Sequence, residues 1–488
     1  MALTFQGGVY VDEHKSARKN PIETFPAPKF VSIPLSQHIG IHAKPLVKSG
    51  DMVDKGQMIA NNEKGLSCPV HSSVSGKVVS IERRVLQTGV QTDYITIEND
   101  FAERLHISVK PFGKKIGETT SYEIIEVIKK AGISGLGGAM FPTYAKIESA
   151  INKVTTLIVN CIECEPYITA DHRLTLERPE AVVNGMKILL KALGLKIGYI
   201  AIADNKLNAA DAITDISSKS KMVEIKILKT KYPQGDERQI IYALTGKEIP
   251  SGKLPVDFGC VVFNAETCAA VYNAFVFGLP LIDRIVTVDG DCIMQPKNLR
   301  VPIGTPASAV IEYCGLREEP KKIIKGGPMM GLAAFDVNTP ITKGTTGILA
   351  FSEKYTKKTT SQCIRCGKCV NGCSMRLMPS YLAMFAQKEE LEMCEKYDIF
   401  NCVECGCCTY VCPAGLPIVQ YIRTAKGRIQ EKQHKNAAIA SAKQFEAPKP
   451  SNQYQGSAAA ARRGTTADTV ENENAVEDRI AEKYNKRK

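Results

Sequence analysis

Eight cysteines in the last third of the chain constrain its fold more than any other feature, because one spacing occurs twice. Each run reads C-x2-C-x2-C-x3-C. Three thiols at this spacing share one tight loop and fit three corners of an iron–sulfur cubane, while the fourth ligand comes from farther away. The two runs contain Cys363, Cys366, Cys369, Cys373 and Cys402, Cys405, Cys408, Cys412. This part of the chain is therefore predicted to fold around inorganic centres.

The spacing is that of the bacterial ferredoxin run, in which the fourth cysteine of each run ligates the cluster of the other run. We therefore predict two [4Fe–4S] clusters. Their ligands would be Cys363, Cys366, Cys369 and Cys412 for the first cluster, and Cys402, Cys405, Cys408 and Cys373 for the second. Structural zinc is the alternative, but zinc usually takes its ligands as two C-x2-C pairs. Ser374 stands where a proline is usual, which we interpret as a variation in turn chemistry. Cys394 and Cys407 are predicted to be unligated, packed thiols.

The overall composition is typical of a soluble, intracellular protein. The 488 residues are enough for three or four domains, with 44% hydrophobic and 23% charged residues. The other cysteines show no disulfide-scaffold spacing, which together with the clusters indicates a reducing compartment. The N-terminus lacks the apolar stretch of a secretory signal. The most apolar segment, residues 260–282, contains polar side chains and is predicted to be a buried helix rather than a membrane span.

The formal net charge of +12 limits the classes of partner. A positive chain favours an anionic membrane surface or acidic partner subunits. Nucleic acid is another common partner of basic proteins, but no aromatic–basic motif is present and tryptophan is absent. We therefore expect no nucleic acid partner.

The hydrophobic pattern divides the rest of the chain. Residues 25–98 combine short apolar stretches with glycine turns, which predicts a small β-barrel or sandwich. Strands and helices alternate over 117–283, which predicts a parallel sheet with helices on its faces. Residues 284–349 are β-rich with one short helix. Helical spacing over 380–399 predicts a helix between the cluster loops. The composition after residue 430 predicts a disordered or loosely helical tail.

A glycine-rich stretch, "SGLGGAMFPTYAK" (134–146), lies in the predicted α/β domain. Its glycines allow close backbone approach, and exposed amides near a helix start favour phosphate. It does not match G-x-G-x-x-G, so we do not predict an ordinary dinucleotide fingerprint. Three other loops follow predicted strands, at the edge where open α/β sheets bind ligands. They are "NCIECEP" (160–166), "ADNK" (203–206) and "YPQGDE" (232–237).

The order of these motifs resembles two related families. "GLGGAMFPTYAK", "NCIECEP", "QGDE" and "FNAET" resemble the NADH- and FMN-binding flavoprotein subunit of respiratory complex I. With the N-terminal barrel and two ferredoxin runs, the chain is more similar to the C-subunit family of Rnf-type ion-translocating electron-transport complexes. This resemblance spans roughly residues 1–425 in order, and the complex I flavoprotein has only one cluster run.

The resemblance implies a set of cofactor-binding residues. The FMN site would contain Gly135, Gly137, Gly138, Lys146, Asn160, Glu163 and Asn264, with Lys146 near the phosphate or ribityl oxygens. The nicotinamide nucleotide would be bound by Phe141, Glu165, Gly235, Asp236 and Glu237. Two departures concern the glycine loop: complex I has arginine where this chain has Leu136, and glycine where it has Met140. No catalytic acid, base or nucleophile is implied.

The resemblance also implies a multidomain α/β and α+β fold with a Rossmann-like cofactor domain. The segments would be a barrel-sandwich hybrid domain (1–110), an FMN- and NADH-binding α/β domain (111–283), a β-grasp, SLBB-like domain (284–349), a helical two-cluster ferredoxin-like domain (350–429) and a low-complexity, disordered tail (430–488).

The implied function is that of a peripheral electron-transfer subunit on the cytoplasmic side of the cell membrane. It would pass electrons between NAD(H), FMN and two [4Fe–4S] clusters, while integral membrane and iron–sulfur subunits couple NAD(H)–ferredoxin electron transfer to ion translocation. Ferredoxin would be an indirect partner. Two alternatives stay open: a soluble reductase of the cobalamin-reductase type, and a non-enzymatic iron–sulfur relay whose flavin site has decayed, which Leu136 and Met140 would favour.

Overall fold

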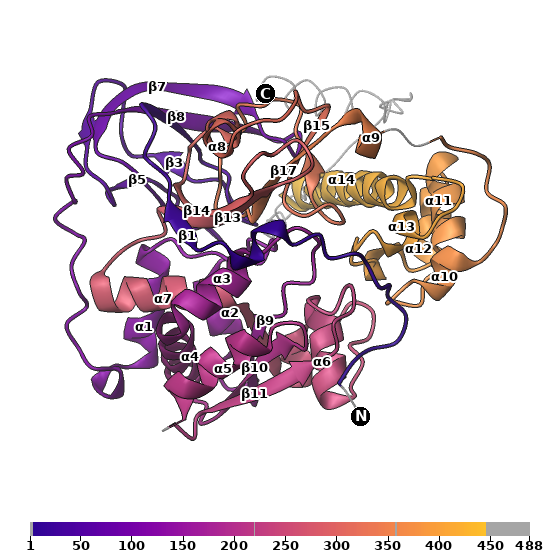
Figure 1. The fold of residues 1–488 in the computed structure, drawn as a ribbon, viewed down its shortest axis with the longest axis horizontal. Helices are drawn as coiled ribbons and strands as arrows, with labels where there is room; N and C mark the ends of the chain where they lie inside the picture. Colours follow the sequence, from indigo (N-terminus) through magenta and orange to yellow (C-terminus); the bar gives the residue numbers. More distant parts are fainter. Residues whose placement is uncertain (1–2, 219, 357–358, 446–488) are drawn as a thin grey trace, which may run out of the picture. The chain divides into compact units, whose positions relative to one another are not determined.

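The computed structural model describes residues 3–218, 220–356 and 359–445, with side chains up to residue 437. Residues 1–431 form one compact unit, and the architecture below is that of this unit. Figure 1 shows its parts in sequence colours: a barrel, a parallel α/β layer, a mixed sheet and a helical segment with the cysteine runs. Within the described residues, no helix combines the length and apolarity needed to cross a membrane.

Two antiparallel sheets form the barrel. Its strands are β2 (Phe30–Pro34), β3 (Lys44–Pro45), β4 (Met52–Val53), β5 (Met58–Asn61), β6 (Val70–His71), β7 (Gly76–Val85) and β8 (Gln91–Asn99), in the orders β2-β8-β7-β4 and β3-β5-β6. Val31, Ile33, Ile95 and Ile97 are fully buried between them, because alternate residues of a strand point to one face. The predicted barrel-sandwich is confirmed.

The segment before the barrel packs elsewhere. Leu3 forms a bridge with Leu228 of the α/β sheet. Strand β1 (Ile22–Thr24) pairs in parallel with β14 (Lys297–Pro302) of the mixed sheet. Residues 1–24 were predicted to belong with the barrel, whereas the described part of this segment contacts two other domains. Such pairing joins residues far apart in sequence, so local periodicity does not reveal it.

A parallel sheet in the order β11-β10-β9-β12 forms the centre of the α/β domain. One face, with Val159 and Ile202, packs against helices including α4 and α7, and the other, with Ile158 and Ala201, packs against α6 (Figure 1). The elements are η2 (Ile116–Glu118), α1 (Ser121–Lys130), α2 (Thr143–Ala150), β9 (Thr156–Cys161), α3 (Ala170–Glu177), α4 (Pro179–Leu193), β10 (Gly198–Ala203), α5 (Leu207–Ser217), β11 (Val223–Leu228), α6 (Glu237–Thr245), η3 (Pro255–Phe258), β12 (Cys260–Asn264) and α7 (Ala265–Phe277). The predicted alternation and parallel pairing are confirmed.

The prediction of one buried helix over residues 260–282 is wrong at its start. Residues 260–264 form strand β12, and α7 begins only at Ala265. The Asn264 side chain accepts hydrogen bonds from the N–H groups of Glu266 and Thr267, which is the usual way to begin a helix. The apolar run is therefore a buried strand followed by a buried helix, two structures with similar composition.

A six-stranded mixed sheet follows, in the order β1-β14-β13-β17-β15-β16. Its further elements are η1 (Ser16–Lys19), β13 (Asp283–Asp289), α8 (Ala307–Cys314), β15 (Lys322–Lys325), β16 (Leu332–Ala333), β17 (Gly347–Phe351) and α9 (Glu353–Thr356). It joins the α/β domain through a buried ion pair, because the Arg284 Nη2 and Glu266 Oε2 atoms lie 2.9 Å apart. Removing one partner of such a pair leaves an uncompensated buried charge.

The cysteine segment is helical. Its elements are α10 (Lys368–Asn371), α11 (Pro379–Gln387), α12 (Leu391–Lys396), η4 (Ile399–Asn401), α13 (Cys407–Tyr410) and α14 (Ile418–Phe445). The single helix predicted between the cluster loops is two helices, separated at Glu389, whose φ is 59°. Helix α14 extends into the region predicted as a disordered tail, and residues 446–488 of that prediction lie outside the described residues.

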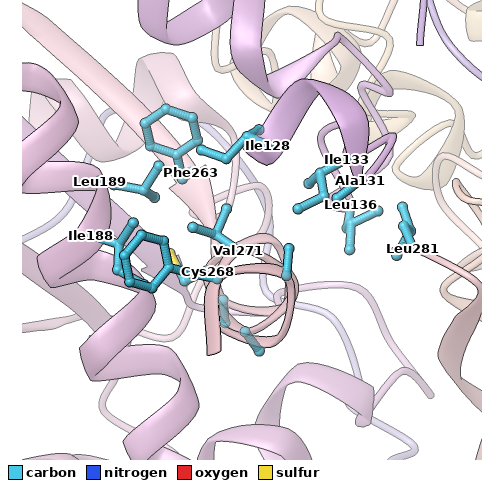
Figure 2. Packing of buried hydrophobic residues seen from close by; sticks show 14 of the residues in the cluster. Ile128, Ala131, Ile133, Leu136, Ile188, Leu189, Phe263, Cys268, Val271 and Leu281 are labelled. Carbon is cyan, nitrogen blue, oxygen red and sulfur yellow. The ribbon is translucent and has the colours of Figure 1, made fainter. Parts of the chain in front are cut away.

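Helices α4 and α7 approach closely at Gly185. Figure 2 shows Cys268 and Val271 of α7 beside Ile188 and Leu189 of α4. A Cβ added at Gly185 would lie 1.9 Å from the Cys268 carbonyl oxygen, far inside van der Waals contact. The sequence therefore requires glycine here so that the two helices can cover one face of the sheet together.

We expect Gly185→Ala to destabilise the protein by about 2 kcal/mol or more, because the two helices must separate to admit the methyl group. Thermal unfolding followed by circular dichroism measures the effect, since the chain has no tryptophan.

Gly427→Ala is the matched control. Gly427 also lies inside a helix, α14, but an added Cβ there meets no atom within 4 Å. This substitution should stabilise the helix by about 0.5–1 kcal/mol. Equal effects at the two glycines would contradict the packing argument.

Candidate functional site

The strand order reverses at one point of the parallel sheet. Strands β10 and β11 follow β9 on one side, and β12 returns to pair with β9 on the other side. Ligands of open α/β sheets bind in the crevice that such a reversal leaves at the carboxyl ends of the strands. The last ladder pair at this point is Asn160 of β9 with Asn264 of β12, two residues that were predicted as flavin contacts.

Both asparagines have structural bonds. The Asn160 Nδ2 atom donates to the Gly235 carbonyl oxygen at 2.9 Å, which holds the "QGDE" loop at the crevice. The Asn264 Nδ2 atom donates to the Asp171 Oδ2 atom at 2.6 Å, while its oxygen caps α7. Their positions at the crevice match the prediction, and a ligand would meet side chains that are already oriented.

The glycine loop lies against this pair. The Gly135 N–H donates to the Phe141 carbonyl oxygen at 2.8 Å and closes the loop. Gly137, Gly138 and Ala139 at its tip are exposed. A Cβ added at Gly137 would lie 3.3 Å from the Asn264 Cβ atom, so a side chain there would crowd the crevice. Phe141 is partly buried.

The loop leads directly into helix α2, which begins at Thr143. A helix N-terminus after exposed backbone amides is a favourable place for a phosphate group. On the same helix, the Lys146 Nζ atom lies 3.1 Å from the Glu237 Oε2 atom and over the Phe263 ring. The exposed amides, the helix N-terminus and a cation together fit the anionic part of a flavin nucleotide.

The two departures from the complex I motif have structural roles. Leu136 is only 1% exposed and packs near Ile133 and Leu281 in the core (Figure 2). Its carbonyl oxygen accepts a bond from the buried Arg284 Nη2 atom at 3.2 Å. Met140 has a φ of 49°, where glycine would be unstrained. Neither residue covers the exposed backbone at the loop tip.

Two lysines, the partly buried Lys15 and the buried Lys206, hold the loop that follows β9. The Lys15 Nζ atom donates to the carbonyl oxygens of Glu163 and Glu165 at 3.1 and 2.9 Å. The Lys206 Nζ atom donates to the Ile162 carbonyl oxygen at 2.8 Å. Burial lowers the pKa of Lys206 to about 8. Lys206 ends the predicted "ADNK" loop, although no role was predicted for its side chain, and nothing in the local sequence identified Lys15.

Glu163 does not reach the glycine loop through any bond in the described residues. Its Oε1 atom accepts the Asp171 N–H at 2.7 Å at the start of α3, and its φ is 45°. Burial raises the pKa of its carboxyl group to about 7. Glu163, predicted as a flavin contact, therefore acts on the crevice indirectly. It fixes the start of α3, and with it Asp171, whose carboxylate accepts the bond from Asn264.

Glu165 connects three domains. Its carboxylate accepts N–H bonds from Met329 and Met330 of the mixed-sheet domain at 3.1 and 3.0 Å. The Tyr232 hydroxyl lies 3.3 Å from the Glu165 Oε1 atom and donates to the Cys405 carbonyl oxygen at 2.7 Å. Burial raises the pKa of Glu165 to about 7. The residue predicted to face the nucleotide is thus engaged between the crevice and the second cysteine loop.

The residues of the "QGDE" loop have different structural roles. The Gly235 N–H donates to the Cys164 Sγ atom at 3.3 Å, and a Cβ at Gly235 would lie 3.0 Å from that sulfur. Asp236 caps α6 by accepting the N–H groups of Arg238 and Gln239. Burial, followed by the charge of Glu237, raises the pKa of Asp236 to about 6. Of the two acidic residues of this loop that were predicted to bind the nucleotide, Asp236 is used in the helix cap, whereas the Glu237 carboxylate pairs with Lys146.

Five cysteines line one apolar cavity beside this edge of the α/β domain: Cys373, Cys402, Cys405, Cys407 and Cys408. Burial raises the pKa of Cys402 to about 12, with smaller contributions from the neighbouring Cys405 and Cys373 thiolates. Burial, then the charges of Cys402, Cys405 and Cys373, raise the pKa of Cys408. The four ligands predicted for the second cluster, including the fourth cysteine from the other run, are among these five, and Cys407 is the additional one. Metal binding would displace these protons.

The other four cysteines are less enclosed. Cys363 and Cys366 are exposed, Cys369 is buried and Cys412 is partly buried. Cys369 and Cys412 belong to one apolar cluster of the helical segment, which also contains Cys373, Cys394, Cys402 and Cys408. Cys394 and Cys407 are fully buried in apolar surroundings.

We expect Glu165→Gln to flatten the pH dependence of unfolding. Because burial raises the pKa of Glu165 from 4.5 to about 7, its contribution to stability is present below pH 4.5 and is lost as the pH rises to 7. Between pH 4.5 and 7, the free energy of unfolding of the wild-type protein should fall by up to about 1.4 kcal/mol per pH unit more than that of the variant. Thermal midpoints at several pH values measure the slope. Glu148→Gln, at an exposed position, is the control, and parallel curves for wild type and Glu165→Gln would refute the prediction.

Known proteins match this chain along its length. The profile described as RnfC barrel sandwich hybrid domain matches residues 3–102. The Nuo51 FMN-binding domain matches residues 128–273, and the SLBB domain matches residues 285–333. These three matches follow the barrel, the α/β domain with its crevice, and the mixed sheet.

Several curated relatives cover most of the chain. The chain is 41% identical over 430 residues, 87% of its length and 97% of the relative, to the C subunit of the Na(+)-translocating ferredoxin:NAD(+) oxidoreductase complex of Acetobacterium woodii. It is 42% identical over 431 residues, 87% and 94% of the two chains, to the proton-translocating counterpart of Clostridium ljungdahlii. The C subunit of the ion-translocating oxidoreductase complex of Rhodobacter capsulatus is 39% identical over 439 residues, 88% and 84% of the two chains. The chain therefore belongs to the C-subunit family of ion-translocating ferredoxin:NAD(+) oxidoreductase complexes, as its glycine loop and two cysteine runs indicated.

Proposed function

We propose that this protein transfers electrons between NAD(H), FMN and two [4Fe–4S] clusters as the peripheral subunit of an ion-translocating oxidoreductase complex. The main observation that supports this proposal is that two sites lie next to each other within one compact unit. The crevice at the β9–β12 reversal and the cysteine-lined cavity are connected by Glu165 and Tyr232, the latter bonded to the Cys405 carbonyl.

The glycine-loop crevice would hold FMN, which when bound accepts a hydride and releases its electrons singly. The exposed backbone of Gly137, Gly138 and Ala139 leaves room for the cofactor. Lys146 supplies a cation on the helix that follows the loop, and Asn160 and Asn264 line the strand ends. The partly buried Lys15 and the buried Lys206 orient the loop after β9 and need not touch the cofactor. Glu237 is the acidic residue that we assign to the nucleotide.

The cavity formed by Cys373, Cys402, Cys405 and Cys408 would hold the cluster nearer the flavin, because it faces Tyr232 of the α/β domain. The more exposed set of Cys363, Cys366, Cys369 and Cys412 would hold the farther one. One-electron centres in this order would lead electrons from the crevice toward the surface of the helical segment.

The names of the relatives support membrane partners. They are subunits of sodium-translocating and proton-translocating ferredoxin:NAD(+) oxidoreductase complexes. We infer that integral membrane and iron–sulfur subunits carry the ion pathway, that ferredoxin is an indirect partner, and that this chain binds at the cytoplasmic face. The relay alternative depended on Leu136 and Met140, and their roles in the core and at a turn leave the loop tip open, which favours a functional flavin site.

Lys146→Ala should weaken FMN retention about ten- to a hundredfold and leave the clusters intact. A charge-assisted hydrogen bond to an anionic group is worth about 1.5–3 kcal/mol. Flavin occupancy after dilution measures the effect, with iron and acid-labile sulfide as an internal check. Lys153→Ala removes an exposed lysine nearby and should retain FMN fully. Equal retention in both variants would remove Lys146 from the site.

Anaerobically purified protein should contain FMN and two clusters, and NADH should reduce them. An NADH titration followed by absorbance and EPR tests this directly. Bleaching of the flavin band should be accompanied by cluster signals of two kinds, because the two cysteine sets have different surroundings. Iron-replete protein that takes up no flavin and does not respond to NADH would overturn the proposed function.

A further inference from the structure

The two cysteine loops are repeats whose surroundings differ. Cys402 follows Cys363 by 39 residues, and helix α13 follows α10 by the same interval. The positive φ angles of Gly367 and Gly406, 75° and 78°, also correspond. Of three residues between the ligands, the first is aliphatic in both loops and the other two differ in character. The first loop has Ile364, Arg365 and Lys368, and the second has Val403, Glu404 and Cys407.

The second loop is enclosed by the rest of the chain. Cys407 is fully buried and packs against Val9 and Tyr232. A Cβ added at Gly406 would lie 2.7 Å from the Met329 carbonyl oxygen, so the mixed-sheet domain covers the loop there. This loop therefore faces inward, toward the crevice.

The charge on the second loop is neutralised within the protein. The Glu404 carboxylate forms ion pairs with Arg423 at 2.8 Å and Lys426 at 2.7 Å. The Lys426 Nζ atom also donates to the Cys402 carbonyl oxygen at 3.0 Å. The negative charge of Glu404 is therefore compensated within the protein.

The first loop is open. Cys363 and Cys366 are exposed, and Ile364 between them is 66% exposed. Arg365 and Lys368, the two charged residues of the loop, are both exposed. Within the described residues neither side chain forms an ion pair, in contrast to Glu404 of the second loop. A Cβ added at Gly367 meets no atom within 4 Å, in contrast to its counterpart Gly406. An apolar side chain and two positive ones thus surround two predicted cluster ligands.

We propose that Ile364, Arg365 and Lys368 form the docking surface for an acidic one-electron carrier protein, which exchanges electrons with the cluster of Cys363, Cys366, Cys369 and Cys412. The proposal rests on the proposed function and adds the exit site and the charge of the partner. The step moves one electron from the reduced cluster to the partner's metal centre, and no bond or proton is transferred. A protein carrier is the occupant because a lipid surface cannot accept an electron.

The physics favours a transient, charge-steered contact. Positive charges around an electron exit attract an acidic partner and raise its association rate by about 10–1,000-fold, an effect that salt screens. One exposed isoleucine supplies a small apolar centre, as expected for a weak redox encounter rather than a permanent interface. The net charge of +12 acts in the same direction over longer distances.

The experiment uses the full-length protein with its clusters, reduced with dithionite and desalted, so that neither NADH nor the flavin site is required. The probes are the soluble haem domain of cytochrome b5, an acidic one-electron acceptor, and cytochrome c, a basic one. Stopped-flow haem reduction is measured for wild type, for Arg365→Glu with Lys368→Glu, and for the neutral Arg365→Gln with Lys368→Gln.

Lys196→Glu with Lys221→Glu is the matched control. It changes the net charge equally, at positions that precede β10 and β11 at the amino edge of the sheet. EPR spin counts establish that each variant keeps both clusters, and the neutral pair replaces the charge-reversed pair if the latter loses one.

At low ionic strength, charge reversal on the first loop should slow reduction of cytochrome b5 about tenfold or more and accelerate that of cytochrome c, with smaller changes in the neutral variant. The differences should disappear at high salt, and the control should resemble wild type. Equal rates in all variants, or equal losses with both haem proteins, would overturn the proposal. The proposal would also be overturned if charge reversal abolished binding to vesicles of anionic phospholipid but left the cytochrome b5 rate unchanged. That result would assign the loop to a membrane surface. Absence of NADH reduction would instead refute the proposed function and leave this assay interpretable.

Discussion

The return of β12 to the open side of β9 is the constraint on which the rest of the site depends. It places the carboxyl ends of two adjacent strands at a crevice, with Asn160 and Asn264 as the last ladder pair. The glycine loop can lie against that pair only because Gly137 has no side chain. Helix α7 begins at Asn264 itself, so the residue that lines the crevice also caps the helix. One strand pairing thus fixes a loop, a helix and two polar side chains together.

Buried charges then tie this crevice to the other domains. Lys15, from the N-terminal segment, and Lys206, from the loop after β10, bond the carbonyl oxygens of the loop after β9. Arg284 pairs with Glu266 and also reaches the glycine loop through the Leu136 carbonyl. Burying a charge is costly unless it is paired and hydrogen-bonded, so each of these contacts disfavours any other arrangement of the segments it joins.

The cysteine repeat shows how one local structure can serve two tasks. The two loops share spacing, glycine conformation and a following helical turn, as the proposed ligation of one cluster by each loop would require. What differs is the residue between the ligands. Cys407 packs into the unit, whereas its counterpart Lys368 belongs to the open loop. The duplicated cysteine motif thereby has an enclosed copy and an exposed copy, as the proposed chain of two electron carriers would need.

The sequence by itself determined the features whose cause is local. Hydrophobic period defined the strands and helices of the α/β domain, ligand spacing defined the cysteine runs, and three glycines marked the exposed loop. It was ambiguous where two structures share one composition, as for residues 260–282, which form β12 and α7. Only the tertiary structure decided which residues and segments that are distant in sequence lie in contact. The packing of residues 3–24 on two other domains and the position of Glu165 between three domains follow from long-range contacts. That the Asp236 carboxylate caps a helix also became visible only in the structure. The physical reason is that a carboxylate looks the same in sequence whether its partner is a helix N-terminus, a distant loop or a cofactor.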